Sequence, residues 1–143
     1  VNLSGGRLWW DDESVPGEER QLYVAGVTGD LPGATLSAAQ VVGASRAGEE
    51  GIQPFLDGAA LYWMGSGKIV TSDLAAGADP SAAPSWSAAT AILGPAASPD
   101  AGIVAVGEPT VAHVGAETWL YFVYIKKTAA GYDANVARIR KRE

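Results

Sequence analysis

The side chains that could do chemistry in this sequence are few, and their types already exclude several kinds of site. The 143 residues contain no cysteine and one histidine, His113. Within these residues, cysteine nucleophiles, thiolate zinc sites and paired-histidine metal sites are therefore excluded. As a catalytic base, His113 would need a nucleophile and an orienting carboxylate, and Glu117 is the only candidate carboxylate near it in the sequence. We favour the simpler interpretation that His113 forms hydrogen bonds within a turn.

Three other short patterns lack the features of the sites they suggest. Residues 65–67 read Gly-Ser-Gly but have neither the G-x-S-x-G spacing nor the strand-to-helix context of a nucleophile elbow. The glycines within 26–33 are not followed by Lys-Ser or Lys-Thr, so they do not predict a phosphate loop. The acidic run at 11–13 lacks the alternating ligands of a calcium loop. We therefore predict no metal site and no cofactor.

The elements that would position any site come from an internal repeat. Three copies of a hairpin pattern combine a short apolar run, a glycine turn and an aromatic strand, at 1–10, 54–63 and 109–122. A third strand-like segment follows each copy, at 21–27, 68–74 and 135–141. A fourth segment follows only the first two copies, and both of its occurrences, at 36–43 and 86–94, contain Ser-Ala-Ala. The third copy ends before a fourth strand would begin.

Each unit therefore has four short strands in about 50 residues, the size and content of one β-propeller blade. Helix patterns are poor, and the alanine-rich stretch 75–85 is broken by glycine and proline, so it is predicted to be a loop. We predict an all-β, β-propeller-like fold with about three four-stranded antiparallel blades, the last lacking its final strand. The blade-like repeats span 1–43, 52–94 and 106–143 of a single domain, 1–143.

These blades resemble those of TolB-like and sialidase-like propellers. The resemblance rests on IQPFLDG at 52–58 followed by LYW at 61–63, and on GEPT at 107–110 followed by WLYF at 119–122. In such propellers ligands meet the ring at its axial mouth, where the loops that enter the innermost strands converge. The resemblance also implies an extracytoplasmic location, periplasmic or secreted. It implies a mouth formed by Gln53, Glu108, Asp11, Asp12 and Lys126.

A carbohydrate-active propeller of the glycosidase or sialidase-like kind is the alternative that this resemblance leaves open. Glycoside hydrolysis needs one acid and one base or nucleophile, and Glu108 with Asp11 or Asp12 could supply the two carboxylates. Acidic residues in loops bounded by proline and glycine are more often solvated turn formers. Trp9 or Trp119 could also face outward and stack on a sugar, although packing between blades explains most of the tryptophans.

Three blades do not make a ring, because closed propellers have about four to eight. An open wedge would expose faces that in a ring bury aromatic residues such as Trp10, Trp63 and Phe122. We therefore predict a non-catalytic binding or assembly module, whose ring is completed by a second copy, in a homo-oligomer, or by a partner chain.

Charge is unevenly distributed along the chain. The last 18 residues hold six of the ten basic residues, although the net charge of the whole chain is −6. In a strand Arg138, Arg140 and Arg142 share one face, which suits an edge strand protected by charge. They could instead contact an acidic partner, such as residues 11–19 of a second copy. The acidic remainder argues against nucleic-acid binding, and no stretch is long and apolar enough to span a membrane.

Overall fold

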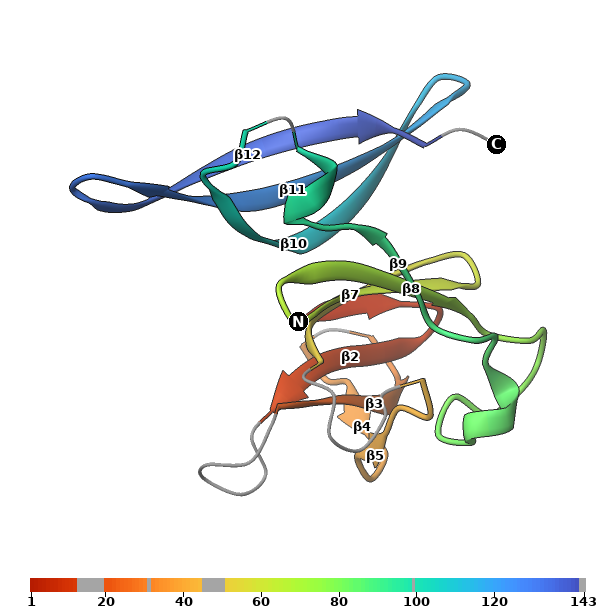
Figure 1. The fold of residues 1–143 in the computed structure, drawn as a ribbon. Helices are drawn as coiled ribbons and strands as arrows, with labels where there is room; N and C mark the ends of the chain where they lie inside the picture. The colour runs from red at the N-terminus through yellow and green to blue at the C-terminus, as the bar shows by residue number, and fades with distance from the viewer. Residues whose placement is uncertain (13–19, 31, 45–50, 99, 142–143) are drawn as a thin grey trace.

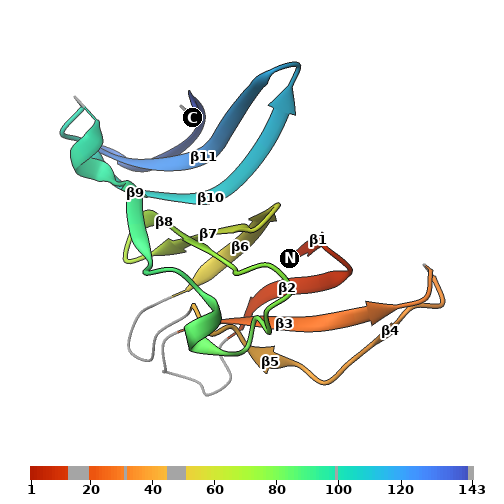
Figure 2. The ribbon, with the colours of Figure 1, turned by 90° about the vertical axis from the view of Figure 1, so that its right-hand side faces the viewer.

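The computed structural model describes residues 1–12, 20–30, 32–44, 51–98 and 100–141, and within them the fold is all-β. The strands form three antiparallel sheets, and none of these sheets closes on itself in the described part of the chain. Figures 1 and 2 show the sheets as three layers, with the second sheet between the first and the third. The prediction of an all-β chain built from antiparallel sheets is confirmed.

Each sheet is formed by strands that are consecutive in the sequence. The first sheet contains β1 (Asn2–Ser4), β2 (Arg7–Asp12), β3 (Gln21–Thr28), β4 (Thr35–Leu36) and β5 (Gln40–Val41). The second contains β6 (Ile52–Asp57), β7 (Ala60–Gly65), β8 (Lys68–Asp73) and β9 (Thr90–Leu93). The third contains β10 (Ile103–Val114), β11 (Glu117–Thr128) and β12 (Gly131–Arg140). Two short 3-10 helices, η1 (Ala83–Ser85) and η2 (Pro95–Ala97), flank β9.

The predicted strand segments overlap these strands, and the alanine-rich stretch is a loop that contains η1. The first sheet has five strands instead of the four expected, because the segment predicted as one fourth strand at 36–43 is covered by two short strands, β4 and β5, which both pair with β3. The third sheet differs from the expectation in length, because β10 begins at Ile103 and both strands of its first hairpin are 12 residues long. In the described residues this sheet has three strands, whereas the second sheet has a fourth, β9, paired with β8.

The repeated Ser-Ala-Ala has a structural role that the two copies share. Ser37 Oγ accepts a hydrogen bond from the backbone N–H of Gly26 at 2.9 Å. Ser87 Oγ accepts one from the backbone N–H of Asp73, also at 2.9 Å. In each sheet the serine therefore hydrogen-bonds to the backbone of the third strand, β3 or β8, and holds the segment that follows it beside that strand. This shared contact explains why the serine recurs at the same place in the two repeats.

The second sheet is buried on both faces by its neighbours. Along β7, Leu61 and Trp63 point toward the first sheet and Tyr62 points toward the third, so the run reads as continuously apolar. The first interface packs Trp9, Leu22, Val24, Val42 and Ala44 against Leu56, Leu61, Trp63 and Trp86. The second packs Tyr62 and Ile69 against Val106, Val111, Leu120 and Phe122. Two separate hydrophobic clusters therefore hold the three layers together.

The two tryptophans at 9 and 10 are arranged in the opposite way to the expectation. Trp9 is fully buried between the first and second sheets, where its ring packs edge to face on that of Trp86, with 6.3 Å between the ring centres. Trp10 lies on the other face of the first sheet, where its ring stacks on that of Tyr23 with 5.8 Å between the ring centres. The expectation that Trp9 could face outward is therefore wrong. Strand register decides this, because Trp9 pairs with Val24 on the face that the second sheet covers.

Candidate functional site

A row of polar side chains crosses all three sheets. Asp11 Oδ1 of β2 accepts a hydrogen bond from the backbone N–H of Gln53 at 3.0 Å, and its Oδ2 pairs with Arg20 at 2.8 Å. Gln53, on β6, reaches the third sheet through two hydrogen bonds to Glu108 of β10. Its Oε1 accepts from the Glu108 backbone N–H at 2.9 Å, and its Nε2 donates to Glu108 Oε1 at 3.1 Å. Three of the five residues expected at an axial mouth, Asp11, Gln53 and Glu108, are thus linked in space.

The backbone at Gln53 and Glu108 is strained in the same way. Both residues precede a proline and adopt left-handed conformations, with φ of 55° and 51° respectively. Each lies in an irregularity of the strand pairing, between Ile52 and Phe55 in one sheet and between Gly107 and Thr110 in the other. Such conformations cost about 1–3 kcal/mol each in a residue other than glycine, and they gather at functional or tightly packed sites.

Gly107 lets the third sheet come close to the second beside this row. A Cβ atom at Gly107 would overlap the sulfur of Met64 and would lie 3.3 Å from Oε1 of Gln53. The absence of a side chain at this position therefore allows the Gln53 amide to reach the backbone of Glu108.

The chemistry open to these carboxylates is limited by their partners. Both oxygens of Asp11 are engaged, and its side chain is only 11% exposed. Gln53 lies between Asp11 and Glu108 and is hydrogen-bonded to both, whereas a glycosidase pair must leave room for the sugar between its two carboxyl groups. Asp12 occupies the exposed end of β2, opposite Gln21. The arrangement is suited to holding the three sheets in fixed positions relative to one another.

Lys126 does not join this row. It lies on β11 opposite Ile103, and its ammonium group pairs with Asp100 Oδ2 at 2.5 Å. The hydrogen bond from Lys126 holds the pKa of Asp100 below its ordinary value, helped by the backbone N–H of Gly102. The same contact with Asp100 raises the pKa of Lys126. The pair fastens β11 to the segment that precedes β10.

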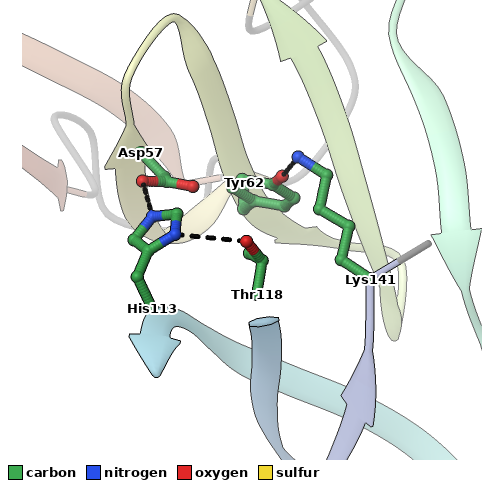
Figure 3. Close-up of polar contacts among 5 residues, drawn as sticks. All are labelled: Asp57, Tyr62, His113, Thr118 and Lys141. Carbon is green, nitrogen blue, oxygen red and sulfur yellow. Dashed lines mark hydrogen bonds and ion pairs between the residues drawn. The ribbon is translucent and has the colours of Figure 1, made fainter. Parts of the chain in front are cut away.

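His113 takes part in a contact between sheets that sequence reasoning missed. Its Nε2 lies 2.8 Å from Asp57 Oδ1 of the second sheet, and its Nδ1 lies 3.1 Å from Thr118 Oγ1. Figure 3 shows the His113 ring between these two side chains. The carboxylate expected beside it, Glu117, instead accepts hydrogen bonds from Arg140 and Trp119. The internal repeat could have indicated this contact, because Asp57 and His113 both lie at the hairpin end of the first strand of their sheets.

A second contact between sheets lies near the C-terminal end of β12. Lys141 Nζ donates to the hydroxyl of Tyr62 at 2.8 Å, and the ammonium group lies 5.6 Å from the centre of the Tyr62 ring (Figure 3). The hydrogen bond to Tyr62 raises the pKa of Lys141, so this lysine is cationic at neutral pH.

Arg138 and Arg140 share one face of β12, as the alternation predicts. The structure places this face on the side of the third sheet that points away from the second. The guanidinium carbon of Arg138 lies 4.4 Å from the centre of the Trp119 ring, and the guanidinium group donates to the hydroxyl of Tyr121 at 3.2 Å. Arg140 pairs with Glu117 at 3.0 Å. Arg142 lies outside the described residues, as do residues 13–19, which supply most of the acidic segment proposed as its contact.

Among the described residues no group of three or more His, Asp or Glu side chains is placed to hold a metal ion. Those residues also contain no helix that is long and apolar enough to cross a membrane. No protein-family model, curated protein or solved structure matches the chain.

Proposed function

We propose that this chain is a non-catalytic, β-propeller-type assembly module whose ring is completed by a second copy or a partner chain. Each sheet would be one blade, with its first strand innermost. The observation that carries the proposal is that the first and third sheets each have an apolar outer face with no neighbour in the described part of the chain. The second sheet, which lies between two neighbours, is buried on both faces.

The outer face of the first sheet is defined by strand register. Leu3 pairs with Leu8, Trp10 with Tyr23, and Tyr23 with Val41, so these side chains share the face opposite Trp9. Leu3 is 54% exposed and Val41 is 42% exposed. A contiguous aromatic and aliphatic surface of this kind is typical of an interaction site.

The outer face of the third sheet is apolar and basic. Its residues are Trp119, Tyr121, Val123, Ile125, Val136, Arg138 and Arg140. Val136 is 72% exposed, and the aromatic side chains beside it are half-buried. Residues 1–125 carry four basic and fourteen acidic side chains, whereas the last 18 residues carry six basic and two acidic ones. Opposite charge would therefore favour contact between the C-terminal face of one chain and the body of another.

Two copies arranged head to tail would supply about six blades, within the range of closed propellers. We expect the purified chain to have about twice its monomer mass of 14.7 kDa in light scattering. Val136→Asp and Leu3→Asp each place a carboxylate on one outer face and should shift the mass to that of the monomer. Ala76→Asp, in the exposed loop after β8, is the matched control. A monomer that unfolds sharply, with both face variants equally stable, would contradict completion by a second copy.

The carbohydrate-active alternative has one observation in its favour, the strained backbone at Gln53 and Glu108. Strain of this kind accompanies many ligand sites. The hydrogen bonds that occupy both carboxylates of the row favour the structural role instead. An activity measurement on the Glu108→Gln variant separates the two functions.

A further inference from the structure

The last strand of the third sheet has one unpaired edge. β12 pairs with β11 from Gly131 to Arg140, and in the described part of the chain no strand pairs with its other edge. An exposed edge of this length is a template on which another extended segment can add.

The direction of the backbone groups on this edge follows from one hydrogen bond. The N–H of Lys141 donates to the carbonyl of Thr118 at 2.9 Å, and the pairing continues without a bulge. Hydrogen-bonded pairs alternate in an antiparallel ladder, so Ile139 also points its backbone groups inward, to β11. Arg140, Arg138 and Val136 therefore direct their N–H and C=O groups away from β11, toward the unpaired edge.

The second sheet shows what occupies the corresponding edge there. β9 pairs with β8, and Leu93 of β9 packs against the cluster between the second and third sheets. In the first sheet, β4 and β5 pair with β3 in the same way. Among the described residues only the third sheet lacks such a strand, and the pattern Ser-Ala-Ala-x-x-aliphatic occurs twice within these 143 residues.

A cleft of about 390 Å³ lies between the second and third sheets beside this edge. Its apolar wall includes Ile92 of β9, Leu120 of β11 and Ile139 of β12. Lys141 and Tyr62 line its polar side. Figure 3 shows the hydrogen bond that joins these two side chains. A strand added to β12 would direct alternate side chains into this cleft, and aliphatic side chains suit its apolar wall.

The residues of an added strand that face the other way would meet cations. Arg138 and Arg140 lie on the outer face, and a residue hydrogen-bonded directly opposite either of them shares that face. Carboxylates are the cross-strand partners that these guanidinium groups favour. The occupant that fits both faces is an extended segment in which aliphatic and acidic residues alternate. These 143 residues contain no such segment over five or more positions.

We propose that β12 accepts a strand from a partner polypeptide, an extended acidic and aliphatic segment that pairs antiparallel with the edge formed by Val136, Arg138 and Arg140. This proposal deepens the proposed assembly function by naming what the partner contributes and where it binds. Main-chain hydrogen bonds supply the affinity, and the cleft and the two arginines set the sequence pattern.

The test uses the whole chain and a labelled peptide, Val-Glu-Val-Glu-Val-Glu-Val, whose binding is followed by fluorescence anisotropy. In the proposed register the glutamates lie opposite the arginines and hydrogen-bond to β12, while the valine amides point away. N-methylation of the glutamate amides should weaken binding by about tenfold or more, because the bonded donors are lost. N-methylation of the valine amides should leave binding within about threefold. A peptide of the same composition with the alternation broken should bind weakly.

A variant of the protein locates the site. Ile139→Asp places a carboxylate in the cleft and should weaken peptide binding, whereas Val114→Asp, on the exposed hairpin end of β10, should not. Thermal unfolding checks that both variants are folded. No binding by the unmodified peptide, equal effects of the two methylation patterns, or indifference to Ile139→Asp would each overturn strand addition. A chain that dimerises through its faces but does not bind the peptide would retain the assembly function and lose this inference. A monomer that binds the peptide would rule out completion by a second copy and retain this inference.

Discussion

Gln53 and Glu108 are joined by two hydrogen bonds across the boundary between the second and third sheets, and each is held in a left-handed backbone conformation just before a proline. The same local conformation occurs in two neighbouring repeats, and these hydrogen bonds join the two strand irregularities. The backbone N–H of Gln53 also binds Asp11 of the first sheet. One glutamine therefore connects all three sheets, whereas each of the two hydrophobic clusters joins only two of them.

Glu108→Gln tests whether this row is a catalytic site. The substitution keeps the backbone N–H that binds Gln53 and keeps a side-chain oxygen that can accept from it, so we expect the free energy of unfolding to change by less than about 0.5 kcal/mol. An assembly module should show no turnover of aryl glycosides, before or after the substitution. Glu117→Gln, which alters a carboxylate on the third sheet's hairpin, is the control. Hydrolysis by the native chain that falls by about 100-fold or more in Glu108→Gln alone would establish the glycosidase alternative.

Gly43 and Gly94 end the fourth-strand segments of the first two repeats, but the structure gives them different surroundings. A Cβ atom at Gly43 would lie 2.5 Å from the carbonyl carbon of Ala82 and 2.6 Å from the nitrogen of Ala83. The loop backbone would have to move, so Gly43→Ala should lower the free energy of unfolding by about 2–3 kcal/mol. Gly94→Ala meets only the flexible side chain of Lys68, at 3.1 Å, and should cost less than about 1 kcal/mol. Urea denaturation measures both, and equal effects would contradict the close packing at Gly43.

The pair formed by Asp100 and Lys126 predicts a pH dependence in acid. The pKa of Asp100 is held below its ordinary value of 3.8 in the folded chain, chiefly by the hydrogen bond from Lys126. A carboxyl group whose folded pKa is depressed stabilises the protein above its unfolded pKa, and that stabilisation is lost as the pH falls through the folded value. Asp100→Asn should therefore flatten the loss of stability below about pH 4. Urea midpoints between neutral and acidic pH measure the effect, with Asp30→Asn as the control. A loss of stability in acid identical to that of the native chain would contradict the assignment.

Much of the fold could be predicted from local pattern. Alternation, glycine turns and the recurrence of Ser-Ala-Ala predicted the strands of the three sheets and the loop at 75–85, because each depends on residues close together in the chain. The shared face of Arg138 and Arg140 follows from alternation in the same way. Local pattern could not decide which face of a strand meets a neighbouring sheet, and for Trp9 the choice made from sequence was wrong.

The sequence by itself determined an all-β chain, its strand order and a polarity of charge from an acidic body to a basic end. Only the tertiary structure decided that His113 meets Asp57 rather than Glu117, that Gln53 separates Asp11 from Glu108, and that Lys126 pairs with Asp100. Each of these contacts joins segments far apart in the chain. They depend on how the sheets are packed face to face, a relationship set by the two hydrophobic clusters and not by spacing along the sequence.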